Sequence, residues 1–409
     1  MRRRNGAVEK LGLMPGRRVG RSVVATANNT GYRNDLVKVA ITRLFDQIEP
    51  RLQDIVKPGD RVFVKPTVRH GSVTDPAKRL TSHPAVVRAV IESVIDCGGI
   101  VSFGDEGAKS LTDSPGPHVR WLREIARRTG ARLVNFRQAG VRELPGLHIF
   151  SRPYPISLAL LETNHIINCA NLQPHNHLLL AGAIKNMFNA VIGKRQNILY
   201  QLNRRPKDLA RVVVDVFERV EPTLSILDLT TVHEVGTDHS VRFRPAGVIL
   251  ASTDSVALDA IAAWVVGCGE RRIWTTYFAS RRGLGHAGNE EIEVRGPGAS
   301  EPRLRLKLLA PPVAQKAKVY DRLSSYLSHT VLRPRPVVDP GSCVGCGDCV
   351  TFCPTGAIEV KSDKLARIER RCCIECAACI DACGENAIQM QPSGINRVAR
   401  SIASSMRLN

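Results

Sequence analysis

Short apolar runs alternate with segments of helical periodicity along most of the first three hundred residues. RVFVK, which starts at Arg61, predicts a strand, and IVSF, which starts at Ile100, predicts another. Between them, SHPAVVRAVIESVIDCGG places apolar residues on one helical face, with Pro84 at a first helical position and Gly98 as a stop. Together the three segments predict a β-strand, a helix and a second, parallel strand.

The same alternation continues towards residue 300. Helices are predicted around residues 118–128, 179–191, 208–220 and 255–266, and strands at residues 133–136, 166–169, 224–229 and 248–251. Strands that alternate with helices form largely parallel sheets covered on both faces. The pattern therefore predicts an α/β fold, a mostly parallel sheet with helices on both faces.

The pattern changes after residue 310, where a basic segment runs into the stiff sequence RPRP. The expected parts are an α/β core at 1–310 with a basic N-terminal extension at 1–25, a basic connector at 311–337, a small α+β domain at 338–392 and a basic tail at 393–409. The core and the small domain are therefore expected to fold as separate units.

The N-terminal sequence is basic but is not followed by the apolar run that a secretory signal needs. The longest apolar stretch, near residues 256–268, is interrupted by Asp259 and is shorter than the ~20 residues needed to cross a bilayer. The composition, with 43% apolar and 23% charged residues, is that of a globular protein. These features predict a cytoplasmic protein without a membrane span.

Twelve cysteines are present, and nine of them fall between Cys343 and Cys383. Disulfide-rich domains are small and secreted, whereas clustered cysteines in a long chain without an export signal are typical of metal sites in a reducing compartment. The cysteines therefore also favour a cytoplasmic location.

The clustered cysteines form a duplicated motif. CVGCGDCVTFCP, from Cys343, matches CIECAACIDACG, from Cys373, at an offset of 30 residues. In each CxxCxxCxxxC half, three closely spaced thiolates can bind irons of one cubane, while the fourth cysteine points away and binds the other. The predicted ligands are Cys343, Cys346, Cys349 and Cys383 for the first [4Fe–4S] cluster, and Cys373, Cys376, Cys379 and Cys353 for the second.

This segment resembles the bacterial ferredoxins that carry two [4Fe–4S] clusters, and the resemblance implies a small ferredoxin-like α+β fold. Gly384 stands where the second half usually has proline, which leaves the ligand set intact. A zinc ribbon needs only two CxxC pairs and would leave half of the thiols unused. Cys372 is an additional thiol that we interpret as a spare.

The charge is unevenly distributed. Lys and Arg number 58 against 38 Asp and Glu, a net charge of +20. Residues 338–392 hold five Lys and Arg against eight Asp and Glu, a net of −3, so the rest of the chain carries +23. This surplus allows anionic partners. Nucleic acid is not favoured among them, because aromatic residues are only 5% of the chain and no known reader motif is present.

In open parallel sheets, ligands bind beyond the carboxyl ends of the strands. Lys65 follows the RVFV run, and Asp105 and Glu106 follow the IVSF run, so a cation and two carboxylates are expected at one edge. They can serve as anion-binding and acid/base groups, or they can form an ion pair at the strand ends. The sequence leaves both interpretations open.

The densest polar stretch is NCANLQPHNHLLLAGAIKNMFNAVIGKR. In it, Lys185 stands in an otherwise apolar helical pattern, and a desolvated Lys is a common anion-binding or acid/base group. The candidate catalytic residues are Lys185, His175, Lys65, Asp105 and Glu106, and the candidate substrate-binding residues are Asn171, Gln173, His177 and Asn186. The alternative is that the polar groups of this stretch only cap the helix and satisfy buried backbone.

Five blocks of the core resemble, in the same order, those of the DUF362 family, a domain of unsettled function that is often fused to a ferredoxin module. They are TSHPAVVRAVIESVIDCGG, FGDEGA, GAIKNMFNAVIG, LDLTTVHEVG and STDSVALDAIAAWVVG, and the resemblance covers most of residues 30–300. In the last block, Asp254 is expected to cap its helix.

The family has a P-x-L-K-T-H loop that aligns with residues 170–175. His175 is kept there, whereas the proline and the lysine of the loop are lost, and Asn189 stands in place of a usual glycine. Lys185 or Lys65 would then have to supply the positive charge.

Other motifs are absent or stand in the wrong context. GLGHAG at residues 283–288 fits GxGxxG, but it follows a helical segment and precedes a strand-like one, the reverse of what pyrophosphate binding needs. No GxxxxGK[ST] phosphate loop and no GxSxG elbow occur. A further metal at His175 and His177 has no carboxylate partner to support it.

The sequence therefore favours an iron–sulfur oxidoreductase. An external ferredoxin or reductase would supply electrons to two [4Fe–4S] clusters, and a small, anionic organic substrate at the strand ends would receive them. The alternative is a non-catalytic electron-transfer or assembly protein whose core binds a partner protein.

Overall fold

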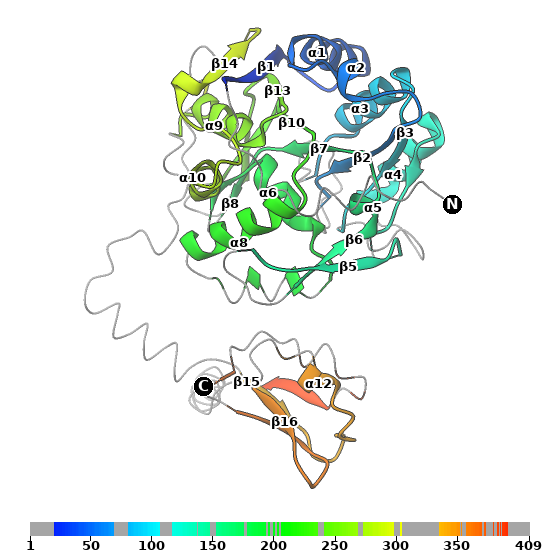
Figure 1. Cartoon of the computed structure of the whole chain (residues 1–409), viewed down its shortest axis with the longest axis vertical. Helices are drawn as coiled ribbons and strands as arrows, with labels where there is room; N and C mark the ends of the chain where they lie inside the picture. The colour runs from blue at the N-terminus through cyan, green and yellow to red at the C-terminus, as the bar shows by residue number, and fades with distance from the viewer. Residues whose placement is uncertain are drawn as a thin grey trace, which may run out of the picture. The chain divides into compact units, whose positions relative to one another are not determined.

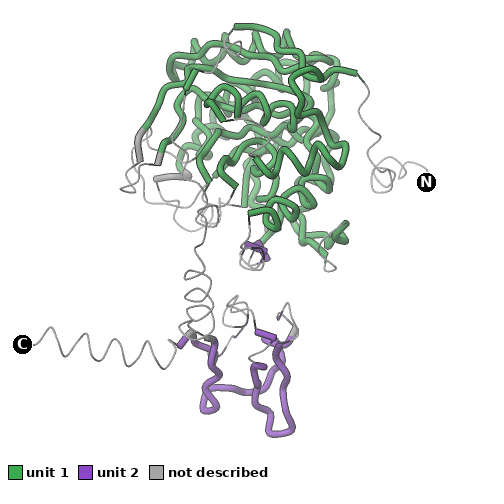
Figure 2. Tube along the Cα trace, turned by 90° about the vertical axis from the view of Figure 1, so that its left-hand side faces the viewer, with its two compact units in different colours: residues 1–193, 205–311 green, residues 194–204, 312–409 purple. Residues whose placement is uncertain are grey.

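The structure, a computed structural model, describes two compact units of the chain: residues 1–193 with 205–311, and residues 194–204 with 312–409 (Figure 2). Within them it describes residues 20–68, 81–106, 117–136, 138–147, 153–175, 178–193, 195–196, 199–200, 203, 206–235, 241–268, 273–297, 303–304, 335–351, 353, 357–369, 372–373, 379, 383, 385 and 387–391.

The larger unit contains strands and helices in alternation. In chain order they are β1 (Ser22–Asn28), α1 (Asn34–Gln47), α2 (Leu52–Ile55), β2 (Arg61–Pro66), α3 (Pro84–Asp96), β3 (Ile100–Phe103), α4 (Pro117–Thr129), β4 (Arg132–Leu133), β5 (Val141–Leu144), β6 (Tyr154–Ser157), α5 (Leu158–Leu161), β7 (His165–Asn171), β8 (Gln173–His175), β9 (Leu179–Ala181), α6 (Ala183–Met187), the 3-10 helix η4 (Phe188–Ala190), α8 (Pro206–Arg219), β10 (Leu224–Leu229), β11 (Val232–Val235), β12 (Val241–Arg244), β13 (Val248–Ser252), α9 (Ser255–Val265), α10 (Trp274–Arg281), the 3-10 helix η6 (Asn289–Glu291) and β14 (Ile292–Arg295).

An eight-stranded sheet forms the centre of this unit, in the order β14-β1-β13-β10-β7-β2-β3-β4 (Figure 1). Neighbouring strands pair in parallel except at β13, which is antiparallel to both β1 and β10. The prediction of a mostly parallel sheet is confirmed. Because β13 alone is reversed, strands β1, β10, β7, β2 and β3 all end at the same edge, which we call the carboxyl edge.

Helices cover both faces of the sheet (Figure 1). On one face, Ile41 of α1 and Val90 of α3 share a core with Ile167 of β7. On the other, Leu258 of α9 packs with Leu227 of β10. Strands with two covered faces are apolar at nearly every position rather than at alternate ones. Burial of all six residues of β10 fits this arrangement.

Helix α3 begins where the sequence predicts. The His83 side chain accepts a hydrogen bond from the amide of Ala85, and Pro84 occupies the first helical position. Gly98 follows the helix with φ +84°, a left-handed conformation that favours glycine and ends the helix.

Two predicted elements are misplaced. The helix expected over residues 179–191 is wrong in its first part, because Leu179–Ala181 is strand β9, paired antiparallel with β8, and α6 begins only at Ala183. The strand expected at 133–136 is also displaced, since β4 is Arg132–Leu133. A short apolar run fits a strand and a helix equally well by periodicity alone, which explains the first error.

The smaller unit contains β15 (Arg335–Val338), α12 (Asp348–Thr351), β16 (Ile358–Val360), β17 (Ala366–Ile368) and β18 (Ile388–Gln391). β15 pairs antiparallel with β18, and β16 pairs antiparallel with β17. Its small core consists of apolar residues and cysteine side chains, among them Cys349, Cys353 and Cys379. Within the ranges that the structure describes, no helix has both the length and the apolar composition needed to cross a bilayer.

Candidate functional site

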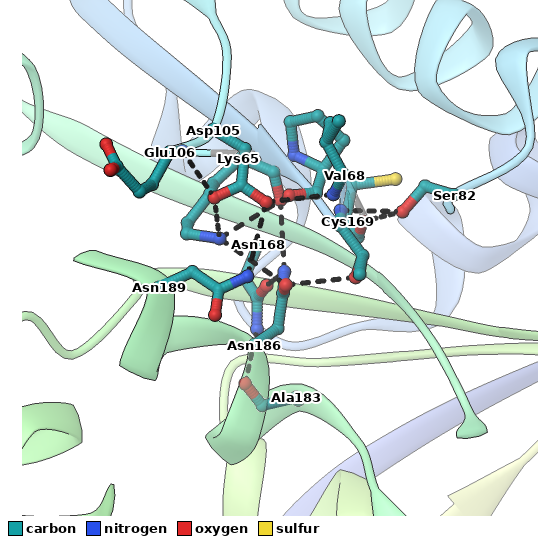
Figure 3. A network of polar contacts seen from close by, with 12 residues as sticks. Lys65, Val68, Ser82, Asp105, Glu106, Asn168, Cys169, Ala183, Asn186 and Asn189 are labelled. Carbon is teal, nitrogen blue, oxygen red and sulfur yellow. Dashed lines mark hydrogen bonds and ion pairs between the residues drawn. The ribbon is translucent and has the colours of Figure 1, made fainter. Parts of the chain in front are cut away.

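Two opposite charges meet at the carboxyl edge, out of contact with solvent (Figure 3). The Nζ atom of Lys65, on β2, lies 3.1 Å from Oδ1 of Asp105, which follows β3, and both side chains are 0% exposed. Burial lowers the pKa of Lys65, Asp105 opposes this shift, and the charge of nearby Lys185 adds to it. The ion pair that the sequence left open is therefore present, and it is completely buried.

Asp105 is further held by the backbone around it. Its Oδ1 atom also accepts a hydrogen bond from the amide of Glu106 (2.8 Å), and its Oδ2 atom accepts one from the amide of Val68 (2.8 Å). The side-chain amide of Asn189 donates to the same Oδ2 atom at 3.4 Å. Glu106 in turn accepts a hydrogen bond from the amide of Gly193 at 3.1 Å. These bonds fix both carboxylates in place.

Asn186, on α6, connects the ends of β2 and β7 (Figure 3). Its Oδ1 atom accepts hydrogen bonds from Thr67 Oγ1 (2.9 Å) and Lys65 Nζ (3.4 Å), and its Nδ2 atom donates to Asn168 Oδ1 (2.7 Å). Asn168 stands opposite Lys65 in the pairing of β7 with β2. The network therefore joins Lys65, Asp105 and Asn186, all of which were predicted from the sequence.

Lys185 brings a second cation to this edge. It lies on α6, is 9% exposed, and its Nζ atom is 5.2 Å from the centre of the Phe188 ring. It is the neighbour whose charge lowers the pKa of Lys65. Among the residues that the structure describes, this edge therefore brings together Lys65 and Lys185 with the carboxylates of Asp105 and Glu106.

The remaining predicted residues follow β7. Asn171 ends this strand, and its Oδ1 atom accepts a hydrogen bond from Gln173 Nε2 at 2.9 Å. His175, on β8, accepts a hydrogen bond at Nδ1 from the amide of Leu178 (3.1 Å). His177 lies outside the described residues.

Two polar residues at the β1 and β10 ends of the edge, Tyr32 and Asp228, were not among the predicted site residues. Tyr32 donates a hydrogen bond to Asp228 Oδ2 (3.1 Å) and stacks on His83 with ring centres 3.7 Å apart. Burial raises the pKa of Asp228. Tyr32 lies between two elements and has no periodic context, so no sequence pattern identifies it.

Ser82 and Asn168 also form hydrogen bonds that connect elements of the edge, and neither was among the predicted site residues. Ser82 Oγ accepts a hydrogen bond from the amide of Thr67 (2.8 Å) and donates to the carbonyl of Cys169 (2.6 Å). Asn168 is a polar residue in a strand of otherwise buried apolar residues, and this signal could have identified it. Asp254 caps α9 as expected, because its Oδ1 atom accepts from the amides of Val256 and Ala257.

In the smaller unit, cysteines from both halves of the repeat surround one cavity. The cavity is lined by Cys343, Cys346, Cys349 and Cys383. Burial raises the pKa of the Cys349 thiol, and the charges of the other three cysteines raise this pKa further. Four cysteine thiolates are the ligand set of a [4Fe–4S] cluster, so these residues fit that group.

The fourth cysteine of each half has the same local environment. Cys353 Sγ accepts a hydrogen bond from the amide of Ala357 (3.1 Å), and Cys383 Sγ accepts one from the amide of Ala387 (3.2 Å). Amide hydrogen bonds to cluster sulfurs are one of the means by which proteins set reduction potentials. The two halves of the repeat therefore share a local structure as well as a spacing.

The second predicted ligand set is only partly described. Cys379 and Cys353 are buried and Cys373 is half-buried, whereas Cys376 lies outside the described residues. Cys372 is exposed.

Two family models match the chain. Residues 62–264 match the domain of unknown function DUF362, and residues 336–359 match the 4Fe-4S binding domain. The resemblance identified in the sequence is confirmed: the chain carries a DUF362 domain followed by a C-terminal 4Fe-4S binding domain.

One relative and two solved structures place the chain among other proteins. The thylakoid-associated protein sll1697 of Synechocystis is 27% identical over 232 residues, which are 56% of this chain and 70% of that protein. The lactate racemase apoprotein of Thermoanaerobacterium thermosaccharolyticum matches with 12% identity and a TM-score of 0.38, over 59% of this chain and 56% of its own. A protein from Thermotoga maritima matches with 12% identity and a TM-score of 0.34, over 62% and 60%. The chain thus spans less than two thirds of these two solved structures.

Proposed function

We propose that this chain, a DUF362 domain joined to a 4Fe-4S binding domain, is an iron–sulfur oxidoreductase. Its C-terminal domain would hold two [4Fe–4S] clusters that receive electrons from an external ferredoxin or reductase. Its core would bind the small, anionic organic substrate that is reduced. The observation that carries this proposal is the cavity lined by Cys343, Cys346, Cys349 and Cys383.

The composition of that cavity supports two clusters rather than one. Three of its cysteines come from the first half of the repeat, and Cys383 comes from the second half. If Cys383, from the second half of the repeat, binds the first cluster, then the second cluster needs a fourth ligand from the first half. In two-cluster ferredoxins the fourth cysteine of the first half, here Cys353, is that ligand. Cys353 has the amide hydrogen bond that this symmetry requires.

A bound [4Fe–4S] cluster exchanges one electron at a time, so two clusters supply the electron pair that, with two protons, saturates one C=C or C=O bond. The chain's own groups would bind and protonate the substrate. The Lys185 ammonium would attract an anionic group, and His175 would donate a proton. Asn171 and Gln173, which follow the same strand, would orient the substrate.

One observation favours the alternative of an electron-transfer or assembly protein that binds a partner. Lys65 and Asp105 neutralise each other and neither side chain is exposed, so this pair has the properties of a structural ion pair. In the enzyme that we propose, these two residues therefore support the site, and Lys185 and His175 act on the substrate.

The two functions are separated by one experiment on the anaerobically prepared, reduced chain. Small unsaturated carboxylates and 2-oxo acids are added, and the return of the oxidised cluster absorbance is followed. Oxidation by a small molecule, with formation of its reduced product, is expected for the enzyme. Oxidation only by a ferredoxin or another protein would support the alternative instead.

A further inference from the structure

Asp259 is a buried carboxylate that the proposed reaction does not use. It lies on α9, where every other residue from Ser255 to Ala263 is uncharged, and it is 6% exposed. Its Oδ1 atom accepts a hydrogen bond from the amide of Ala183 (2.6 Å), and its Oδ2 atom accepts one from the amide of Ile184 (3.1 Å). Both oxygens are therefore bound to the start of α6, which also carries Lys185 and Asn186.

The backbone is shaped to admit this carboxylate. A Cβ atom at Gly182 would collide with Asp259 Oδ1, so a larger residue here could be accommodated only if the carboxylate moved. Glycine at this position therefore lets the carboxylate approach the first turn of α6 closely. Gly182 and Asp259 therefore depend on each other: the glycine leaves the space that the carboxylate needs to reach the amides of α6.

Helix α6 depends on such support because it has only five residues. The first amides of a helix have no partner within it, and a helix this short has little stability of its own. Here the side chain that binds these amides comes from another helix rather than from the preceding residue, since Gly182 makes no side-chain cap. A side chain on α9, that of Asp259, therefore fixes the position of α6.

A series of hydrogen bonds also connects Ser255 of α9 with Ala183 and Asn186 of α6. The hydroxyls of Ser255 and Ser225 are 2.8 Å apart, and Asn168 Nδ2 donates to Ser225 Oγ (3.1 Å) and to the carbonyl of Ala183 (3.0 Å). Asn168 Oδ1 in turn accepts from Asn186 (2.7 Å). The first turn of α6 is thus held at its amides by Asp259 and at a carbonyl by Asn168.

We propose that Asp259 is a positioning residue, which fixes α6 so that Lys185 and Asn186 face the carboxyl edge. This inference rests on the proposed function, in which Lys185 binds the substrate. Asp259 itself touches neither substrate nor cluster in this proposal. It acts through two backbone amides.

The test measures the position of Lys185 without any substrate. The full chain is treated with trinitrobenzenesulfonate, and the modification rate of Lys185 is measured by peptide mass spectrometry together with hydrogen exchange over residues 183–187. Asp259→Asn replaces one acceptor oxygen by an NH₂ group and should raise both rates about tenfold, the factor expected for loss of one buried hydrogen bond. Asp215→Asn is the matched control. It removes a buried carboxylate that binds Tyr154 and Arg282, and it should leave both rates unchanged.

Gly182→Ala tests the same contact from the other side, because the added methyl group must displace the carboxylate; it should give the same increase. If Asp259→Asn and Gly182→Ala fold and leave both rates at the wild-type level, the inference is wrong. The wild-type chain provides a result even if neither variant folds, because exchange of the Ala183 and Ile184 amides at the rate of an unstructured peptide would also overturn it. Since no substrate is used, these results are independent of whether the chain is an oxidoreductase.

Discussion

Cys383 lines the same cavity as Cys343, although the two residues belong to opposite halves of the cysteine repeat. In the two-cluster arrangement that we propose, one ligand set therefore takes cysteines from both halves of the repeat. This sharing of cysteines between the halves is the property that distinguishes a two-cluster ferredoxin arrangement from two independent metal-binding loops. It also makes the loss of each fourth cysteine a specific test.

Removal of Cys383 should abolish one cluster and preserve the other. The anaerobically prepared wild-type chain should contain about eight irons, and Cys383→Ala should contain about four, because the first cluster loses a ligand while the second keeps its own set. Iron and acid-labile sulfide analysis measures this. Cys372→Ala is the matched control, since this exposed cysteine is outside both sets, and it should retain all the iron. Equal iron losses in both variants would exclude the ligand assignment.

Loss of one member of the buried ion pair should strongly destabilise the core. Lys65→Met leaves the charge of Asp105 buried without its partner, which typically costs about 3–5 kcal/mol. Lys65→Met combined with Asp105→Asn should recover part of this loss. Urea unfolding followed by circular dichroism gives the comparison. Arg33→Ala, which breaks the exposed ion pair with Asp35, should leave the free energy of unfolding nearly unchanged, because solvent screens this pair.

Asp259 should make the stability of the core depend on pH. Burial raises the pKa of this carboxyl from 3.8 to about 7. Between these values the folded chain keeps a proton that the unfolded chain has released, so the contribution of Asp259 to stability is fully present below pH 3.8 and is lost as the pH rises to about 7. At 1.36 kcal/mol per pKa unit, the loss amounts to roughly 4 kcal/mol. Unfolding curves of the wild type and Asp259→Asn across this window measure it.

The side-chain amide of the Asp259→Asn variant has no proton to release in this range, so the variant should lack this part of the pH dependence. Because the two proteins differ only at residue 259, the comparison cancels the effect of pH on the rest of the chain, including the C-terminal domain. The same slope of unfolding free energy against pH in both proteins would show that Asp259 is not buried as described.

The sequence predicted much of the fold because burial on two faces leaves a clear pattern. Strands β2, β3, β10 and β13 and helices α3 and α9 lie where the apolar runs and caps place them. The segment after Gln173 was misassigned, because Leu179 to Ala181 is apolar without a period that separates strand from helix. Its pairing with β8 is a tertiary contact, which local pattern does not specify.

The part of the site that lies at strand ends could be predicted, because the carboxyl ends of parallel strands lie at the same edge of a sheet. Lys65 lies at the end of β2 and Asp105 follows β3, so their meeting follows from the topology alone. Asp259 and Tyr32 could not be found in this way. Their partners, the amides of α6 and the carboxylate of Asp228, are distant in sequence and are brought close only by packing.

The central claim is that the core contains a substrate site that receives electrons, with Lys185 binding the substrate. It is tested most directly by the rate at which a small unsaturated carboxylate or 2-oxo acid re-oxidises the reduced chain, measured for the wild type, Lys185→Ala and His175→Ala at equal iron content. We predict product formation by the wild type and rates about 10²-fold lower in both variants, the usual effect of removing an electrostatic or acid/base group. Equal rates in all three proteins would contradict the account.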